Sequence, residues 1–392
     1  MIEPSRTCDV VIVGGAAVGS AVAWFLASNP DFDGSVLVVE KDPTYARCST
    51  TLSAASIRQQ FSTPENIRMS RFGFDFLRDL EGHFGPGADI GFHQQGYLLL
   101  ASPEGLGILE ANVGLQHDYR VDVALLSPTA LAERFPWLAV DGLGGGALGL
   151  SGEGWFDPWG LLELFRKDSR ARGVDYVHGE VVGFGRDGSR IASVELADGG
   201  RIACGAIVNA AGPGAGKVAA MAGVPLPVEP RKRFVFVIDC RVPPGPCPLV
   251  VDPSGLYFRP EGARYITGLS PEDAEDGPCE DFDVDHSWFE DRIWPALAAR
   301  VPAFEAVKVT GAWAGHYDYN TLDQNAIVGP HPEVENLLFA NGFSGHGLQQ
   351  APAVGRAISE LVVHGRYLSI DLARFGYERI AANRPLREIN VI

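Results

Sequence analysis

The segment from Gly14 to Gly19 (GGAAVG) has the residue types and spacing of a turn that binds phosphate groups. The apolar run CDVVIVG precedes it, and SAVAWFLAS, with apolar residues at helical spacing, follows, so we predict a buried strand, a tight turn and a helix. Gly14 allows the sharp bend and Gly19 lets the helix pack on the strand. Ala16 replaces the glycine at the closest approach to a pyrophosphate, but the backbone N–H groups and the helix dipole still attract the phosphates.

A carboxylate follows the turn at the distance that a nucleotide site requires. The apolar segment SVLVVE predicts a second strand that ends in Glu40, twenty-one residues after Gly19. A carboxylate in this place accepts both ribose hydroxyls of an adenine dinucleotide and disfavours a 2'-phosphate, which argues against NADP. The alternative is a solvated strand end. From this part of the chain, the residues expected to contact the cofactor are Gly14, Ala16, Ala17, Val18, Gly19, Glu40, Lys41, Arg47, Ser49 and Thr50.

Residues 200–223 favour FAD over NAD as the dinucleotide. They predict a hairpin strand, the buried strand IVNAAG and the start of a helix, and they resemble the second dinucleotide signature of FAD enzymes of the glutathione-reductase type. In that signature Ala211 and Gly212 let the backbone pass close to the cofactor. Before it we predict a helix from Pro158 to Arg172 and a strand that ends at Val181 and Val182, after which the backbone contacts adenine. The alternative is an ordinary α/β unit.

Three segments carry a resemblance to a known family. They are residues 48–77 (CSTTLSAASIRQQFSTPENIRMSRFGFDFL), residues 317–362 and the GGAAVG turn. They resemble the D-amino-acid-oxidase-like flavoproteins, in particular the branch with sarcosine oxidase, the sarcosine and dimethylglycine dehydrogenases and the FOXRED-type proteins. The resemblance spans essentially the whole chain, and its most specific part is residues 342–347 (GFSGHG).

The resemblance implies an α/β fold with two domains. A Rossmann-like FAD-binding domain of the glutathione-reductase type is expected to be discontinuous, built from residues 1–82, 148–222 and 322–392. Residues 83–147 and 223–321 form the substrate domain with a mostly antiparallel β-sheet. The sequence agrees, because RKRFVFVIDCR, GLYFRPEGARYITGLS and AVKVTGAWAGHYDYN are typical of strands. VPPGPCP and DGLGGGALGLSGEG are predicted to be loops.

The loop at residues 342–347 suits the approach of a flat flavin ring, which needs backbone without bulky side chains. The helix expected from about Leu348 to His364 points its positive end at this loop, where it would stabilise negative charge on a reduced flavin. The alternative is a glycine-rich connector between a strand and a core helix. Further cofactor contacts are expected from Val182, Ala211, Gly212, Gly342, Gly345, His346, Gly347 and Leu348.

Arg58 is the first candidate to hold a substrate carboxylate, because guanidinium groups bind carboxylates in bidentate geometry. The family has an arginine in this segment with that role; the alternative is an arginine that binds the FAD pyrophosphate or a structural carboxylate, and Arg47 is a second candidate for the phosphates. The family's other carboxylate ligand is a lysine, whose position is taken here by Gln349. One arm of the clamp is therefore neutral, which favours a substrate larger than sarcosine or bound with a different tilt. His346 is expected beside the flavin as a positioning residue.

Three further features refine the expected chemistry. The strand region LYFRPEGARYITGLS lacks the lysine that promotes oxygen reactivity in the family's oxidases, and Arg259 and Arg264 are uncertain substitutes, so a dehydrogenase is favoured over an oxidase. His316 occupies the position of the cysteine that binds flavin covalently in some relatives, which implies noncovalent FAD. Aromatic side chains could line the pocket and hold an amine by cation–π contact, or simply pack in the sheet; they are Tyr257, Trp313, Tyr317 and Tyr319.

Composition narrows the partners. The net charge of -17, from 49 acidic and 32 basic residues without a Lys/Arg run, argues against nucleic acid. We expect no membrane span, no export signal and a cytoplasmic protein. Six cysteines without a CxxC pair and nine histidines without ligand spacing indicate no metal site.

We therefore expect an FAD-dependent enzyme that oxidises the C–N bond of an amino acid or an N-substituted, sarcosine-like amino acid. Hydride would pass to flavin, the imine would hydrolyse, and the electrons would go to an acceptor that the sequence does not identify. The first alternative is an FAD-dependent 2-hydroxy acid dehydrogenase, because the same clamp serves a C–OH group. The second is a FOXRED-type assembly factor without small-molecule turnover.

Overall fold

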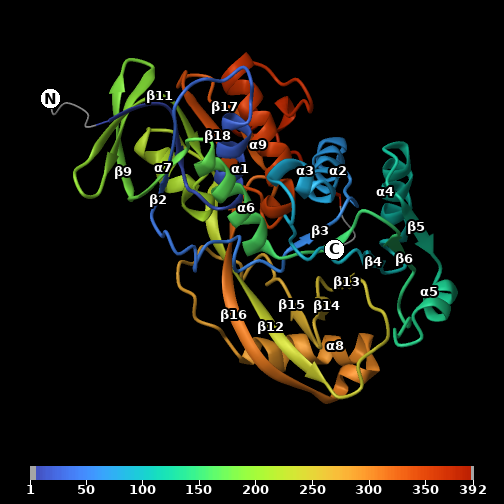
Figure 1. Cartoon of the computed structure of the whole chain (residues 1–392). Coiled ribbons are helices and arrows are strands. Elements are labelled where there is room, and N and C mark those ends of the chain that lie inside the picture. Colours follow the sequence, from blue (N-terminus) through green and yellow to red (C-terminus); the bar gives the residue numbers. More distant parts are fainter. Residues whose placement is uncertain (1–5, 390–392) are drawn as a thin grey trace.

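The computed structural model describes residues 6–389, and within them the chain forms two eight-stranded sheets and a short two-stranded one (Figure 1). The first sheet has the strand order β17-β18-β11-β1-β2-β8, with β10 and β9 added beside β11. Strands β1, β2, β8, β11 and β18 pair in parallel. The bounds are β1 (Arg6–Val13), β2 (Val36–Glu40), β8 (Asp175–His178), β9 (Val181–Asp187), β10 (Arg190–Leu196), β11 (Arg201–Asn209), β17 (Ile327–Pro330) and β18 (Leu337–Asn341).

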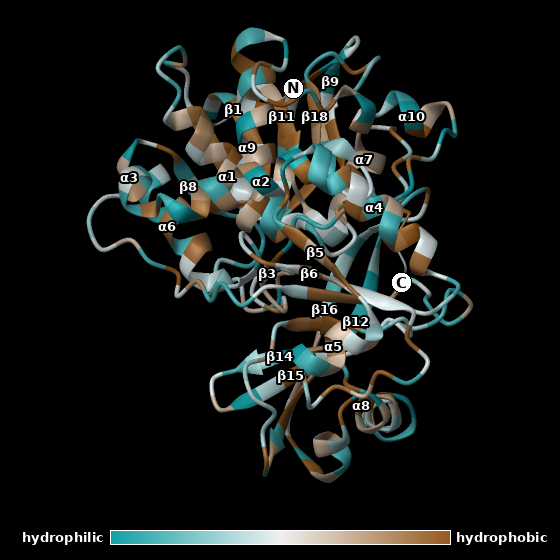
Figure 2. Ribbon diagram, turned by 90° about the vertical axis from the view of Figure 1, so that its right-hand side faces the viewer, coloured by the Kyte–Doolittle hydropathy of each residue, from teal (hydrophilic) through white to brown (hydrophobic). Residues whose placement is uncertain are grey.

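Strand β1 is buried on both faces, as its unbroken apolar sequence predicts. Val10 and Ile12 pack into one core cluster with Val22 of α1 (Ala17–Ala27) and Val354 of α9 (Gly347–His364). Val11 and Val13 point the other way, into a cluster with α7 (Ala215–Met221). Because successive side chains of a strand alternate between its faces, one apolar segment supplies both layers. Figure 2 shows the hydrophobic character of β11 and β18 in the same sheet.

Helices α1 and α9 pack closely on each other at the first sheet. A Cβ atom on Gly355 would lie 2.7 Å from the backbone of Ala21, so only glycine permits this approach. On its other side α1 carries Trp24, whose indole N–H donates to Asp168 and whose ring meets an aromatic cluster that includes Phe76 and Phe165. The remaining helices of this region are α2 (Pro64–Arg78), α3 (Leu80–Phe84), α6 (Pro158–Ala171) and α10 (Glu378–Ala381).

The second sheet has the order β16-β12-β15-β14-β13-β4-β6-β5. Strands β13 and β4 pair in parallel, and its other described neighbours are antiparallel. The long pair β12 and β16 runs from the first sheet to the far end of the molecule (Figure 1). The bounds are β4 (Tyr97–Ala101), β5 (Val123–Leu126), β6 (Gly145–Gly149), β12 (Val228–Cys240), β13 (Leu249–Val251), β14 (Tyr257–Glu261), β15 (Arg264–Gly268) and β16 (Val307–Asn320); its helices are α4 (Leu106–Asp118), α5 (Pro128–Arg134) and α8 (Trp294–Arg300).

The glycine-rich segment DGLGGGALGLSGEG is not a loop throughout, and this prediction was wrong. It contains the buried strand β6 and the short strand β7 (Gly154–Trp155), which pairs with β3 (Ser56–Ile57). The physical reason lies in the packing at Gly146, where a Cβ atom would come within 3.1 to 3.3 Å of three leucine side chains. Glycine serves here to fit a strand between crowded neighbours. Strand β6 also crosses the proposed domain boundary after residue 147, and the domain division stays a prediction.

The two predicted strands of residues 200–209 form one continuous strand, β11, whose hairpin partner is β10. The helices predicted at Pro158 and Leu348 are present within one residue of the expected bounds, and the helix predicted from Ser20 begins three residues earlier, at Ala17. Between residues 6 and 389, no helix has the length and apolar character needed to cross a bilayer.

Candidate active site

A cavity of about 1080 Å³ opens where the first sheet meets the second. Its wall combines the turn after β1, the end of β2, the start of α9 and residues of β14 and β16. In open parallel sheets ligands bind outside the carboxyl ends of the strands, and this cavity has that location. Its volume exceeds the range of about 300 to 1000 Å³ that is usual for small-molecule pockets, so it accommodates a large cofactor together with a substrate.

The turn after β1 has the geometry that its glycines predict. Gly14 has a φ of +98°, and a Cβ atom there would lie 2.4 Å from the carbonyl oxygen of Ala210. A Cβ atom on Gly19 would lie 1.9 Å from the oxygen of Gly14, so Gly19 packs the helix on the turn and does not line the cavity. Ala16, Ala17 and Val18 do line it.

Helix α1 presents its positive end to the cavity. The N-cap residue Ala16 supplies no side-chain cap and no acidic residue stands in the first turn, while Thr50 Oγ1 accepts Ala17 N–H over 3.2 Å. An uncapped helix start attracts anionic groups such as a pyrophosphate. The predicted contacts Lys41, Arg47, Ser49 and Thr50 line the same cavity.

Glu40 lines the cavity at the end of β2. Its two carboxylate oxygens accept the N–H groups of Gly15 and Asp42, each over 2.8 Å. Each carboxylate oxygen has a further lone pair, so Glu40 remains able to accept ribose hydroxyls.

Val182 is not a wall residue, and this prediction was wrong. The strand beside β2 is β8, which ends at His178 opposite Glu40, and Val182 lies in the following strand β9 with 49% of its surface exposed. Gly179 N–H donates to Glu40 O and closes the pairing, so residues 178–180 line this end of the cavity instead. The signal missed in the sequence is Gly179, which separates two strands that we had joined. Gly342 is likewise absent from the wall, whereas Ala211 and Gly212 lie on it.

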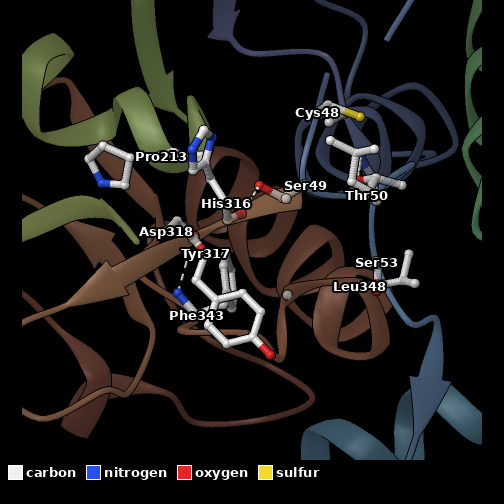
Figure 3. Close-up of a pocket in the computed structure, with 18 of the residues that line it drawn as sticks. Cys48, Ser49, Thr50, Ser53, Pro213, His316, Tyr317, Asp318, Phe343 and Leu348 are labelled. Carbon is white, nitrogen blue, oxygen red and sulfur yellow. Dashed lines mark hydrogen bonds between the residues drawn. The ribbon is translucent and has the colours of Figure 1, made fainter. Parts of the chain in front are cut away.

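The loop before α9 is shaped by its glycines and by a buried carboxyl. Gly345 has a φ of +102°, and a Cβ atom there would lie 2.7 Å from the ring of Tyr317. Asp318 of β16 holds this loop: its carboxylate accepts Phe343 N–H over 3.1 Å and its carbonyl accepts Ser344 N–H (Figure 3). Burial raises the pKa of Asp318 to about 6. Sequence reasoning missed Asp318, because nothing in the chain marks it as facing a loop that lies 25 residues away.

Helix α9 begins at this loop without a side-chain cap and without an acidic residue in its first turn. Gly345, His346, Gly347 and Leu348, which we predict to contact the cofactor, line the cavity. Two uncapped helix starts, of α1 and α9, therefore border one cavity, and their dipoles favour negative charge at two places in it.

Arg58, His346 and Gln349 come together at one wall. Arg58 Nη2 lies 3.1 Å from His346 Nε2, and Arg58 N–H donates to Gln349 Oε1 over 2.8 Å. Burial, together with the positive charge of Arg58, lowers the pKa of His346 to about 3. The ring is therefore neutral, and because Arg58 donates to Nε2, the proton of this ring belongs on Nδ1.

The Arg58 side chain is 8% exposed, stacks on the Phe61 ring at 4.7 Å and forms no ion pair with a carboxylate of residues 6–389. A buried guanidinium without a carboxylate partner is costly unless a ligand neutralises it. The orientation of the Gln349 amide leaves its NH2 group without a protein partner among the described residues, and both side chains line the cavity. The wall thus offers one charged and one neutral donor to an anion.

The aromatic candidates divide into two groups. Tyr257 and Tyr317 line the cavity, and neither hydroxyl has a hydrogen-bond partner in the described chain. Burial raises the pKa of Tyr257 well above its usual range, so its hydroxyl keeps its proton. Trp313 and Tyr319 do not line the cavity; the Trp313 indole donates to Leu52 O instead. In Figure 3 the Tyr317 hydroxyl extends away from the β16 backbone.

His316 lines the cavity but its ring is engaged elsewhere. Its Nε2 lies 2.9 Å from Asp281 O, its ring meets Phe282 at 4.3 Å, and its carbonyl accepts the Ser49 hydroxyl. Burial lowers its pKa, so it is a neutral residue that anchors the segment 280–282 at the cavity.

The proposed substitutes for a lysine near the flavin are not in place. Arg259 donates to Ala54 O and pairs with Glu261, Arg264 is exposed, and neither lines the cavity. A cation that the sequence did not single out, Arg233, does line it; Arg233 forms a bidentate ion pair with Asp276 at 2.7 Å.

The chain thus combines a parallel sheet, a glycine turn, a carboxylate at the end of the second strand and a second, mostly antiparallel sheet, which is the architecture of the dinucleotide-binding enzymes. The family described as FAD dependent oxidoreductase (DAO) matches residues 9–361, and the chain belongs to it. It is 45% identical to FAD-dependent oxidoreductase domain-containing protein 1 of Xenopus laevis, over 99% of this chain and 86% of that protein. It is 26% identical to sarcosine oxidase subunit beta of Rhizobium meliloti (strain 1021), over 93% of this chain and 86% of that one.

A solved structure with the same fold is L-proline dehydrogenase from P. horikoshii. It is 25% identical and has a TM-score of 0.87, with 98% of this chain and 100% of that chain covered. The α/β fold with a parallel sheet and a mostly antiparallel second sheet, predicted from the sequence, is confirmed.

Proposed function

We propose that this protein is an FAD-dependent dehydrogenase that oxidises the C–N bond of an amino acid or N-substituted amino acid. The observation that carries the proposal is the buried Arg58 guanidinium, which faces the cavity beside the start of α9 without a carboxylate partner among residues 6–389. The names of the sarcosine oxidase subunit and L-proline dehydrogenase support an amine substrate with a carboxylate.

The cavity fits FAD. The turn at Gly14 and the start of α1 would hold the pyrophosphate, Glu40 the ribose, and residues 178–180 the adenine end. The glycine loop before α9 leaves room for a flat ring, and its helix start favours negative charge there. When bound, FAD would supply the acceptor for one hydride, which carries both electrons of the oxidation. His316 is engaged by Asp281 O, and we propose that FAD is held noncovalently.

Arg58 and the Gln349 amide would hold the substrate carboxylate. Arg58 supplies the charge, and Gln349 fixes the Arg58 backbone through its oxygen while its NH2 group donates to the ligand. A clamp with a single charge favours a monocarboxylate. We also propose that the second sheet, with residues 83–147 and 223–321, forms the substrate side of the cavity.

The hydroxyls of Tyr257 and Tyr317 would orient the amine, because both lack protein partners among the described residues and line the same cavity. Neutral His346 accepts from Arg58 and so keeps the guanidinium in place, without a charge that would repel an ammonium group. A hydride donor must be an uncharged amine, and an environment that strips water from the substrate favours that form. The absence of a cavity-lining lysine in β14 and β15 favours a dehydrogenase over an oxidase.

Anaerobic reduction of the bound flavin tests this function directly. The panel comprises N-methyl amino acids, free amino acids of both hands, cyclic secondary amino acids and 2-hydroxy acids, with loss of the visible flavin absorbance as the readout. We expect bleaching by one class of amino acids and none by 2-hydroxy acids. Bleaching by 2-hydroxy acids alone would move the assignment to C–OH oxidation. A flavin that dithionite reduces but no member of the panel reduces would contradict a small-molecule dehydrogenase.

A further inference from the structure

Glu153 is a buried carboxyl that the proposed function does not use. It lies between β6 and β7 and has no exposed surface. One oxygen accepts Gln59 N–H over 2.6 Å and Gln60 N–H over 3.2 Å, and the other accepts the Gln60 amide over 2.8 Å. All three donors belong to the residues that directly follow Arg58, so Glu153 holds the backbone that carries this guanidinium.

The glycines of this segment make room for the contact. A Cβ atom on Gly149 would lie 1.8 Å from Glu153 Oε2, and one on Gly152, whose φ is +73°, would lie 2.1 Å from the Gln59 amide nitrogen. The glycine-rich sequence, which we first took for a loop, thus packs β6 and the following turn against the Arg58 segment. Gly149 and Gly152 thus leave the space in which the Glu153 carboxyl group and the Gln59 amide are buried.

Arg58 is held from two sides. On one side Gln349 Oε1 accepts its N–H group, and on the other Glu153 accepts the next two N–H groups. Glu153 forms no direct ion pair among residues 6–389. The positive charge of Arg58 nevertheless lowers the pKa of Glu153, whereas burial raises this pKa by more. The carboxyl group and a bound anion would therefore share the field of a single cation.

We propose that Glu153 is a positioning residue for Arg58 and that a proton on Glu153 is linked to the binding of a carboxylate at Arg58. The inference rests on the proposed function only in placing a carboxylate ligand at this wall. With Glu153 ionised, Arg58 is already partly compensated and a second anion is disfavoured. With Glu153 protonated, the Arg58 charge is fully available, so binding of a carboxylate draws a proton onto Glu153.

The direction of the pH dependence follows from the groups that face this site. Burial raises the pKa of Glu153 to about 7, so the proton is lost as the pH rises through neutrality and anion affinity falls with it. Tyr97 of β4 keeps its proton because burial raises its pKa, and His346, directly before α9, stays neutral because its pKa is lowered to about 3. Arg58 keeps its charge throughout. Asp318 lines the same cavity, and burial raises its pKa to about 6. Its titration is therefore the second source of pH dependence that the experiment must separate from that of Glu153.

The test is the affinity of the oxidised, FAD-loaded protein for anthranilate and benzoate between pH 6.5 and 8.5, read from the change in the visible flavin spectrum. Both probes are fully ionised in this range, and benzamide is the neutral control. We expect the dissociation constant of wild type to rise by roughly threefold to tenfold, below the limit of tenfold per pH unit set by one proton. Glu153→Gln keeps the shape of the side chain and is expected to flatten this dependence, whereas Asp318→Asn is expected to retain it.

A purely structural role of Glu153 would change the melting temperature of Glu153→Gln and leave the pH slope as in wild type, which would overturn the linkage. A flat wild-type profile, or no binding of either carboxylate at pH 6.5, would overturn it as well. Calorimetry on wild type in two buffers of different ionisation enthalpy keeps the test valid if Glu153→Gln does not fold. We expect net proton uptake on binding at pH 7, and zero uptake contradicts the proposal. None of these readouts uses amine oxidation, so the proposed function can fail independently.

Discussion

Arg58 is the residue on which the proposed function chiefly depends. Its guanidinium is buried, its N–H group is fixed by Gln349, and a neutral imidazole accepts from its Nη2 atom. The contacts hold the charge in place without neutralising it, which is the arrangement expected of a group that waits for an anionic ligand. The residue types alone indicated this role, but the hydrogen bonds to His346 and Gln349 that hold Arg58 come from a segment almost 300 positions away in the chain.

Replacing Arg58 tests this role at the scale of one side chain. Arg58→Lys keeps a positive charge but loses the bidentate fork, and we expect carboxylate affinity to fall about tenfold. Arg58→Met removes the charge, with an expected loss of roughly 100-fold, because a charged hydrogen bond contributes about 1.5 to 3 kcal/mol. Dissociation constants for anthranilate and KM for the substrate would both report the change. Arg292→Met, on the exposed ion pair with Glu275, is the matched control and should leave both constants unchanged.

A substitution at Gln349 can separate the role of its side-chain oxygen from that of its NH2 group. Gln349→Glu keeps an oxygen that accepts Arg58 N–H but replaces the donor that faces the ligand with a second acceptor. We expect carboxylate affinity to fall at least tenfold while the melting temperature changes little, because like charges repel in a buried site. Affinity equal to wild type would show that the Gln349 NH2 group does not reach the ligand.

At the scale of elements, the starts of α1 and α9 decide where negative charge can lie in the cavity. In both helices the N-cap residue supplies no side-chain cap, and the first turn holds no acidic residue. Each helix follows a turn that contains a glycine at which an added Cβ atom would clash with a neighbouring residue. The helices also pack on each other at Gly355.

Gly345→Ala tests the loop that precedes α9. The φ of +102° disfavours any side chain, and the added Cβ atom would lie 2.7 Å from the Tyr317 ring. Backbone strain of this kind costs about 1 to 3 kcal/mol, so we expect a lower melting temperature and a lower flavin content after purification. Gly114→Ala in α4, which does not line the cavity and would place its Cβ atom in open space, is the control and should retain flavin. Equal flavin content in both variants would argue against a close approach of the cofactor at Gly345.

At the scale of the whole molecule, a segment that follows the second sheet's strand β15 borders the cavity between the two sheets. This segment comprises residues 276–282. Within it, Asp276 forms an ion pair with Arg233 and Glu280 forms one with Lys217. The carbonyl oxygen of Asp281 lies against the His316 ring. Glu280 and Phe282 lie on the cavity wall. The contacts of Asp276 and Asp281 hold this segment on β12 and β16, and the Lys217–Glu280 pair joins it to α7 beside the first sheet.

Opening this closure is expected to release FAD faster. Asp276→Asn removes the negative charge of a largely buried ion pair, in which both Arg233 Nη atoms lie 2.7 Å from the Asp276 carboxylate oxygens. Arg233 is then left without its counter-charge. We expect the rate of FAD dissociation, followed by the rise in flavin fluorescence on dilution, to increase about tenfold. Glu275→Gln, one residue away and paired with exposed Arg292, is the control and should leave the rate unchanged. Equal rates in both variants would show that the segment does not retain the cofactor.

The sequence by itself determined the family and the two-sheet α/β fold, and it predicted many of the residues that line the cavity. These features are local: the glycine turn, the carboxylate after the second strand and the loop at Gly345 are set by φ angles, close contacts and spacings within one or two adjacent elements. The errors were of register and of context. Val182 was misplaced because a turn at Gly179 separates two apolar strands, and the strand β6 was missed because its glycines serve packing rather than a turn.

Only the tertiary structure decided which polar groups meet. It joined Glu153 to the Arg58 segment, Asp318 to the loop before α9 and Arg233 to Asp276, and it took Trp313 and Arg259 away from the cavity. The physical reason is that a hydrogen bond between distant segments depends on the docking of the two sheets, and no periodicity or spacing along the chain records that docking. Composition supplies the carboxylates and cations, and the packing of the whole chain selects their partners.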